Sequence, residues 1–191
     1  MQNEIKSALK QTSMNFLALQ EKSDVIEKIA KLWIETLKNG NKIIFCGNGG
    51  SAADSQHISA ELMGKYKIDR NPMPAINLTT NIPSITAIGN DYGYEYVFSR
   101  PLQGVGNKGD LLVGISTSGN SKNILKAFEV AKKMGIKTVA FTGKSGGELI
   151  KEADITLNVP SDVTNYIQEM HIASGHIICG IVEEYFWSQS N

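Results

Sequence analysis

Hydrophobic and polar positions along this chain follow two different periods, which divide it into helices and strands. Apolar side chains first recur every three or four positions, which predicts an amphipathic helix over about residues 2–19. A second helix is expected from Ser23, a candidate N-cap, to Asn39-Gly40, a typical helix end. Short apolar runs then alternate with helical stretches. We expect strands over 42–46, 74–78, 110–115, 137–141 and 155–159, helices from the glycine-rich segment to about 64 and over 121–134, and one long helix from about 161.

This alternation predicts an α/β fold in which helices cover both faces of a parallel sheet. The unbroken apolar run that begins at Leu111 is typical of a strand buried on both faces. The chain has no internal repeat, low-complexity tract or linker, so we expect one domain over 1–191 with 1–40 as a helical extension. The last helix carries a wide apolar band, which indicates burial inside the monomer or against another subunit.

Composition and charge limit the classes of function. Nineteen basic and nineteen acidic residues give a net charge of zero, which argues against nucleic-acid binding and leaves anions to be held by helix N-termini and hydroxyls. Cys46 and Cys179 lie far apart and are expected to be reduced, as in intracellular proteins. No apolar run reaches the roughly 20 residues of a membrane span. The N-terminal segment also lacks the apolar core of a secretory signal, so we expect a cytoplasmic protein.

The segment Cys46-Gly47-Asn48-Gly49-Gly50-Ser51 lies between a predicted strand and a predicted helix. Glycines let the backbone turn tightly and approach a ligand, and a helix N-terminus favours an anion. A dinucleotide site would require the G-x-G-x-x-G spacing and an acidic residue at the end of the second strand. Neither is present, so NAD binding is disfavoured, while a structural turn without a ligand remains the alternative.

The segment Ser116-Thr117-Ser118-Gly119-Asn120-Ser121 also follows a strand and precedes a helix. Its hydroxyls and backbone N–H groups suit a phosphate monoester without a lysine or Mg²⁺. The Gly-Lys-Ser/Thr of a Walker loop is missing, and an N-capped serine-rich turn is the alternative. Because both loops follow strands of a parallel sheet, we expect them to meet at one crevice.

Candidate acid–base and metal-binding residues lie on two predicted helices. His57 and Glu61 are four residues apart and share a helix face, so they could bind a metal or transfer protons, or form a plain surface pair. Gln168 and His176 lie on the last helix, about 12 Å apart along its axis. They could serve one small site only if their side chains lean together or come from different subunits. His171 is expected to be a packing or hydrogen-bonding histidine.

Other polar residues carry weaker signals. Asn90-Asp91 is expected to form a turn that could face the crevice, where Asp91 could bond sugar hydroxyls. The scattered basic residues are expected to be solvated or locally paired; they are Lys42, Arg70, Arg100 and Lys108.

Five runs, CGNGGSAADSQHISAEL, GNDYG, GISTSGNS, TGKSGG and IQEMHIASGH, follow one another over nearly the whole chain. Together they resemble the bacterial phosphoheptose isomerases, which have the sugar isomerase (SIS) fold, a flavodoxin-like three-layer arrangement. That family converts sedoheptulose 7-phosphate to glycero-manno-heptose 7-phosphate, the first step toward activated heptose for lipopolysaccharide or capsule. The run GISTSGNS marks only the SIS superfamily, whereas the HxxxE pair combined with QE and the later histidine is more specific.

The resemblance implies a role for each matching residue. Glu61 and His176 would be the acid–base pair that moves a proton between C1 and C2 through an enediol. One Zn²⁺ per subunit would be held by His57, Glu61, Gln168 and His176. The family forms homotetramers with active sites at subunit contacts. The substrate would contact Asn48, Gly49, Gly50, Glu61, Asn90, Asp91, Ser116, Thr117, Ser118, Ser121 and Gln168, with the phosphate in the serine-rich loop.

Two other classes share the SIS loops. The replication initiator-associating proteins are SIS tetramers that bind protein partners, with Gly-Thr in the first loop and without matches to Glu61 and His176. A different SIS isomerase or a sugar-phosphate-sensing regulator would use the serine-rich loop without the HxxxE pair. This chain has Gly49-Gly50, Glu61 and His176, so the sequence favours the phosphoheptose isomerase.

Overall fold

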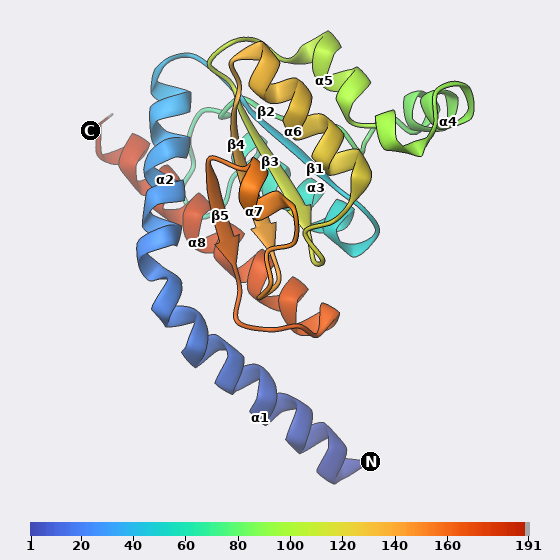
Figure 1. The fold of residues 1–191 in the computed structure, drawn as a ribbon. Helices are drawn as coiled ribbons and strands as arrows, with labels where there is room; N and C mark the ends of the chain where they lie inside the picture. Colours follow the sequence, from blue (N-terminus) through green and yellow to red (C-terminus); the bar gives the residue numbers. More distant parts are fainter. Residues whose placement is uncertain (190–191) are drawn as a thin grey trace.

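Five parallel strands form the centre of the fold in the order β2-β1-β3-β4-β5, as seen in the computed structural model, which describes residues 1–189 (Figure 1). β1 and β3 are buried at every position, as expected for strands covered on both faces. The parallel sheet confirms the predicted fold class. The strand bounds are β1 Ile43–Gly47, β2 Ala75–Asn77, β3 Leu111–Ser116, β4 Lys137–Thr142 and β5 Ile155–Asn158.

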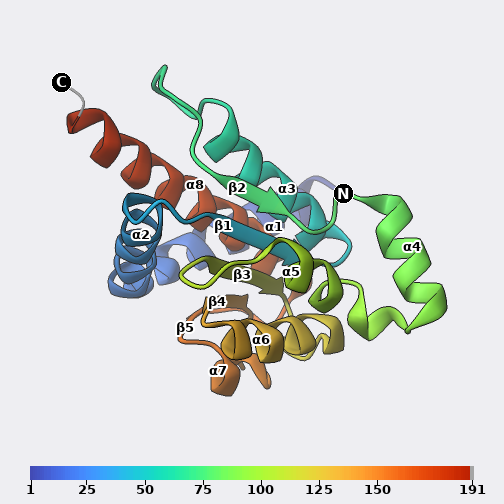
Figure 2. The same ribbon diagram turned by 90° about the horizontal axis from the view of Figure 1, so that it is seen from above.

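Helices cover both faces of the sheet, and Figure 2 shows the resulting three layers. One face carries α2 (Ser23–Lys38), α3 (Gly50–Met63) and α8 (Thr164–Ser188), and the other carries α5 (Ser99–Val105), α6 (Lys122–Met134) and α7 (Leu149–Glu152). Each face has its own hydrophobic cluster. Trp33 and Phe45 are buried in the first, and Leu112 and Phe128 in the second.

The first helix, α1 (Gln2–Leu19), extends away from the sheet (Figure 1). A short 3₁₀ turn, η1 (Gln20–Lys22), connects it directly to α2. The prediction that Ser23 is an N-cap is therefore wrong, because Ser23 itself has helical backbone angles and lies inside a nearly continuous helical segment. At such a junction the preceding turn supplies acceptors for backbone N–H groups that an N-cap would otherwise satisfy; the Ser23 N–H, for example, donates to the Gln20 carbonyl.

The last helix divides its apolar band between two environments. One stripe is buried within the same chain and includes Ile167, Met170 and Ile178. Ile177 and Ile181, on the neighbouring stripe, are 48% and 40% exposed. Within residues 1–189, no helix combines the length and the apolar character needed to cross a membrane.

Three short helices were not predicted, namely α4 (Ile82–Asp91), α5 and α7. The side chain of Asn81 caps α4 by accepting a hydrogen bond from the Ser84 N–H. No residue of α4 is fully buried, although Ile85 and Ile88 pack partly buried against the second hydrophobic cluster. With ten residues, the helix is shorter than the window in which an apolar period is clear. The predicted turn at Asn90-Asp91 is therefore wrong, since both residues belong to the last turn of α4.

Candidate active site

The loops that follow β1 and β3 meet at the carboxyl edge of the sheet. β1 pairs with β3, yet the chain passes from β1 to α3 on one face and from β3 to α6 on the other. Open α/β sheets bind ligands at such a point. Asn48 in the first loop and Asn123 at the start of α6 exchange two amide hydrogen bonds of 2.9 and 2.8 Å. The Tyr94 hydroxyl donates a third to Asn48, over a crevice of about 440 Å³.

The first loop depends on two glycines. Gly49 has φ +55°, a backbone conformation that side chains with a Cβ rarely adopt. At Gly50 a Cβ would overlap the side-chain amide of Gln168, which reaches the start of α3 from α8. The glycines therefore allow the tight turn that their sequence pattern predicts. They also leave room for Gln168 against the loop, a contact that the sequence did not predict.

The serine-rich loop is held by its own hydroxyls. Ser116 Oγ and Ser121 Oγ lie 2.8 Å apart, and the Gly119 N–H donates to Ser116 Oγ over 3.2 Å. The Asn120 N–H donates to Ser118 Oγ, while the carbonyl of Thr117 accepts from the Gly143 N–H. Ser121 is the residue before α6, but its side chain makes no capping bond in the described structure. The first turn of α6 thus presents backbone N–H groups beside two hydroxyls, which suits a phosphate.

His57, Glu61 and His176 converge from two helices packed side by side. His57 Nε2 lies 3.0 Å from Glu61 Oε1 on α3 and 3.2 Å from His176 Nε2 on α8. A glycine makes this approach possible, because a Cβ at Gly175 would overlap the Ile58 side chain. The sequence pairing of His57 with Glu61 is therefore confirmed as a contact, and His176 joins it.

These three side chains suit a divalent metal. Their ligand atoms, two imidazole nitrogens and a carboxylate oxygen, lie within 4.8 Å of one another. Two histidines and a glutamate are one of the ligand sets of catalytic zinc sites, which keep a fourth position open. The side chain of Gln168 lies against Gly50 of the same chain. Gly50 precedes His57 on α3 by seven residues, which is about 10 Å along the helix axis. Within one chain, Gln168 of α8 therefore lies beside the N-terminal end of α3 and not beside the cluster of His57, Glu61 and His176.

Comparisons with known proteins agree with this site. A family model described as SIS domain matches residues 9–143. A phosphoheptose isomerase of Akkermansia muciniphila is 60% identical over 169 residues, which cover 88% of this chain and 89% of that protein. The chain belongs to the phosphoheptose isomerase family.

Further family members match a larger share of the chain. The phosphoheptose isomerase of Helicobacter pylori strain P12 is 50% identical over 181 residues, or 95% of this chain and 91% of that protein. The solved phosphoheptose isomerase of Francisella tularensis superposes with a TM-score of 0.92 at 37% identity, covering 95% of this chain and 97% of that one. The resemblance predicted from the sequence motifs is confirmed, and none of these relatives is a partner-binding SIS protein.

The structure also places the remaining residues that the sequence analysis singled out. Asn90 donates to Asp91 over 2.8 Å at the exposed end of α4, and Asp91 lines a neighbouring groove rather than the crevice beside Asn48. His171 is fully buried and bonds the Thr142 carbonyl over 3.1 Å, which confirms the packing role expected for it. The expectation of solvated or locally paired basic residues is wrong for Arg70 and Lys42, whose side chains are only 7% and 17% exposed. Their carboxylate partners, Glu183 and Asp110, lie 113 and 68 positions away in the sequence.

Sequence reasoning missed Asp54, which lies on the same face of α3 as His57 and Glu61. One of its carboxylate oxygens is buried and has no hydrogen-bond partner among residues 1–189. Burial raises the pKa of Asp54 to about 6, while the nearby His57 acts in the opposite direction. The spacing of Asp54, His57 and Glu61 at three and four residues was the available signal.

Proposed function

We propose that this chain is a ketose–aldose isomerase that converts D-sedoheptulose 7-phosphate to D-glycero-D-manno-heptose 7-phosphate, the first step of activated heptose biosynthesis. The observation that carries the proposal is the convergence of Glu61 and His176 on one face of the α3–α8 pair, beside His57. Relatives named phosphoheptose isomerase at 45% and 60% identity support the same reaction. The partner-binding SIS proteins would need neither residue.

Glu61 and His176 act as the acid–base pair in this proposal. Moving a proton between C1 and C2 requires one group that takes it from carbon and another that handles the proton on oxygen. The carboxylate of Glu61 and the imidazole of His176 can each carry a proton, and both contact His57. Because Glu61 has two carboxylate oxygens, one can face His57 while the other faces the substrate.

A zinc ion fits the same cluster, with His57, Glu61 and His176 as ligands and Gln168 as the further ligand that the family pattern implies. When bound, Zn²⁺ would supply a Lewis acid that polarises the substrate carbonyl. The side chains of the protein would still perform the proton transfers.

The substrate phosphate is assigned to the serine-rich loop. Ser116, Thr117, Ser118 and Ser121 supply hydroxyls around the N-terminus of α6, where anions are favoured. Asn48 lines the crevice between the two loops, and Gly49 and Gly50, which follow it in the first loop, are proposed to contact the substrate as well. Further contacts to the sugar are proposed for Asn90, Asp91 and Gln168.

Complete active sites are proposed to form between subunits of a homotetramer. Glu61 follows Gly50 by eleven positions on α3, about 16 Å along the helix axis, so one chain separates its loops from its acid–base pair by more than a sugar phosphate spans. The exposed apolar side chains of α1 and α8 offer contact surfaces; they are Ile5, Leu9, Phe16, Leu17, Ile177 and Ile181. We propose that 1–191 acts as one SIS domain, with 1–40 as the helical extension, in the cytoplasm. The buried free thiols of Cys46 and Cys179 are consistent with that location.

The direct test follows aldose formation from sedoheptulose 7-phosphate by NMR, before and after metal removal and zinc return. We expect aldose with the purified protein, loss of activity on chelation and recovery with zinc. Activity that survives chelation would leave the reaction to Glu61 and His176 without the metal. No aldose under any metal condition would refute the proposed isomerisation.

A further inference from the structure

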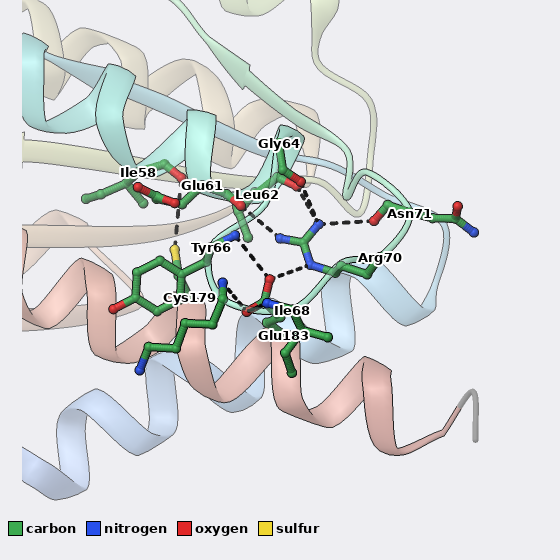
Figure 3. Close-up of polar contacts among 11 residues, drawn as sticks. Ile58, Glu61, Leu62, Gly64, Tyr66, Ile68, Arg70, Asn71, Cys179 and Glu183 are labelled. Carbon is green, nitrogen blue, oxygen red and sulfur yellow. Dashed lines mark hydrogen bonds and ion pairs between the residues drawn. The ribbon is translucent and has the colours of Figure 1, made fainter.

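A buried ion pair connects α8 to the segment that follows α3 (Figure 3). Arg70 Nε lies 3.0 Å from Glu183 Oε1, and the two side chains are only 7% and 1% exposed. Glu183 also accepts hydrogen bonds from three consecutive backbone N–H groups, those of Tyr66, Lys67 and Ile68, at 2.8 to 3.2 Å. A buried carboxylate is stable only when it is satisfied in this way. The pair therefore fixes the turn after α3 onto α8.

The guanidinium of Arg70 holds the end of α3. It donates to the carbonyls of Glu61 and Leu62 at 2.8 and 2.9 Å and to that of Gly64 at 3.4 Å. The last carbonyls of a helix have no partner within it, and a cation there also suits the helix dipole. Arg70 thus fixes the backbone of the turn that carries Glu61.

Glu183 holds the other side of the site through Tyr66. The Tyr66 ring stacks on the His176 ring, with centroids 5.6 Å apart and planes 14° from parallel. Gly180 of α8 has no side chain, which leaves room for the Tyr66 ring, since a Cβ at Gly180 would lie 3.3 Å from that ring. The orientation of His176 toward His57 therefore depends on the turn that Glu183 binds.

We propose that Glu183 and Arg70 are positioning residues of the isomerase, acting on Glu61 through the α3 carbonyls and on His176 through the Tyr66 ring. The inference rests on the acid–base roles proposed above for Glu61 and His176. A pair with only a structural role would affect folding alone. A positioning pair sets where the reacting groups lie, so its loss lowers turnover in protein that remains folded.

The test compares Glu183→Gln with Asp110→Asn, a matched control. Asp110 is equally buried, accepts from the backbone N–H groups of Lys42 and Asn107 and pairs with Lys42 Nζ over 2.6 Å. It lies before β3, at the sheet edge opposite the serine-rich loop. We expect both variants to lower Tm, but only Glu183→Gln to lower kcat, by about 10- to 100-fold, with KM nearly unchanged. Equal kcat in the two variants would overturn the proposal.

Substitutions of Tyr66 test the contact itself if Glu183→Gln does not fold. Tyr66→Leu removes the aromatic ring that stacks on His176 and is expected to lower kcat. Tyr66→Phe keeps the stacked ring and is expected to retain the kcat of the unaltered protein. Turnover of Tyr66→Leu equal to that of the unaltered protein would contradict the proposed role of the stack.

A readout independent of catalysis comes from NMR of the ring protons in metal-free protein, where three histidines give few signals. The His176 signals should shift in Glu183→Gln and Tyr66→Leu, because they lose the ring current of a fixed Tyr66. Those of the buried His171 should stay in place. Unmoved His176 signals would refute the positioning role. If instead Glu61→Gln and His176→Ala keep their turnover, the acid–base roles proposed for these two residues fail, and the His176 shift still decides whether the pair positions that ring.

Discussion

His57 Nε2 and His176 Nε2 lie 3.2 Å apart, although 119 positions separate the two residues in the sequence. The contact depends on how closely α3 and α8 approach each other. Gly175 faces Ile58 at that point, and the thiol of Cys179 lies 4.0 Å from the Ile58 carbonyl one turn further along (Figure 3). A substitution that separates the helices should therefore disturb the acid–base cluster without touching it.

Gly175→Ala is the sharpest such substitution. The added Cβ would lie 2.5 Å from Ile58 Cδ1, so the helices must move apart or Ile58 must change rotamer. We expect a loss of about 1–3 kcal/mol of unfolding free energy, measured in urea, and a lower kcat. The double variant with Ile58→Val, which removes Cδ1, should recover part of both. Normal turnover in Gly175→Ala would show that the spacing of the helices is not critical.

Zinc affinity should depend on His57. His57→Ala removes the ligand that lies between Glu61 and His176, so we expect zinc binding to weaken by at least the roughly 10- to 100-fold that loss of an outer-shell partner costs. Isothermal titration of metal-free protein with zinc measures the effect. Gln56→Ala, a neighbour on α3 that bonds Thr79 instead, is the control and should bind zinc normally. Equal affinities in the two variants would place the metal elsewhere.

The pattern of strands and helices was enough to predict the sheet and its covering helices, because the buried strands and the amphipathic helices have strong periods. α4 was not predicted because its ten residues are too few for a clear apolar period, although Ile85 and Ile88 pack against the core. Ser23 was misassigned because a 3₁₀ turn joins α1 to α2. The junction at Ser23 depends on local backbone geometry and not on apolar periodicity.

The site was predictable where its residues share a motif and unpredictable where they meet across the fold. His57 and Glu61 share a helix face, so their spacing revealed the contact. No spacing connects Arg70 with Glu183, or Tyr66 with His176, because these contacts arise only when α8 packs on α3. The spacing of Gln168 and His176 on the last helix indicated that they lie about 12 Å apart. Their contacts with Gly50 and His57 on α3 required the structure.

Glu61→Gln and His176→Ala should each lower kcat by about 10²–10⁴, the usual contribution of a general acid or base. Both variants lose a group that can carry a proton, although Glu61→Gln keeps the shape of the side chain. Initial rates with sedoheptulose 7-phosphate measure the effect. Glu129→Gln, an exposed glutamate on α6 paired with Lys133, should retain full activity. If both site variants remained near normal, the assignment of the acid–base pair would be wrong.

Phosphate recognition should depend on the two serines that contact each other in the second loop. Ser116→Ala and Ser121→Ala each remove a hydroxyl from a pair 2.8 Å apart at the start of α6. A hydrogen bond to a charged group contributes about 1.5–3 kcal/mol, so KM should rise by about 10-fold or more. Inhibition by inorganic phosphate should weaken in parallel, while Ser188→Ala at the far end of α8 should change neither. An unchanged KM in both loop variants would exclude this loop as the phosphate site.

Stability should fall in mild acid because of His171. Burial lowers its pKa to about 4, although the bond to the Thr142 carbonyl acts in the opposite direction. Its Nδ1 atom has no hydrogen-bond partner in the described part of the chain, so protonation would bury a charged N–H without an acceptor. The unfolded chain takes up this proton near pH 6.5, whereas the folded chain takes it up only near pH 4. The stability that comes from burying neutral His171 is thus fully present above pH 6.5 and is lost as the pH falls toward 4.

The expected size of this loss is about 3 kcal/mol, at 1.36 kcal/mol per pKa unit. His171→Gln can still donate to Thr142 but cannot titrate, so its stability should depend less on pH. Urea unfolding at a fixed protein concentration, measured from pH 7 to pH 4, gives both curves. The difference between the two proteins cancels the contributions of other ionisable groups, such as Asp54. Two parallel curves would mean that His171 does not control the acid response.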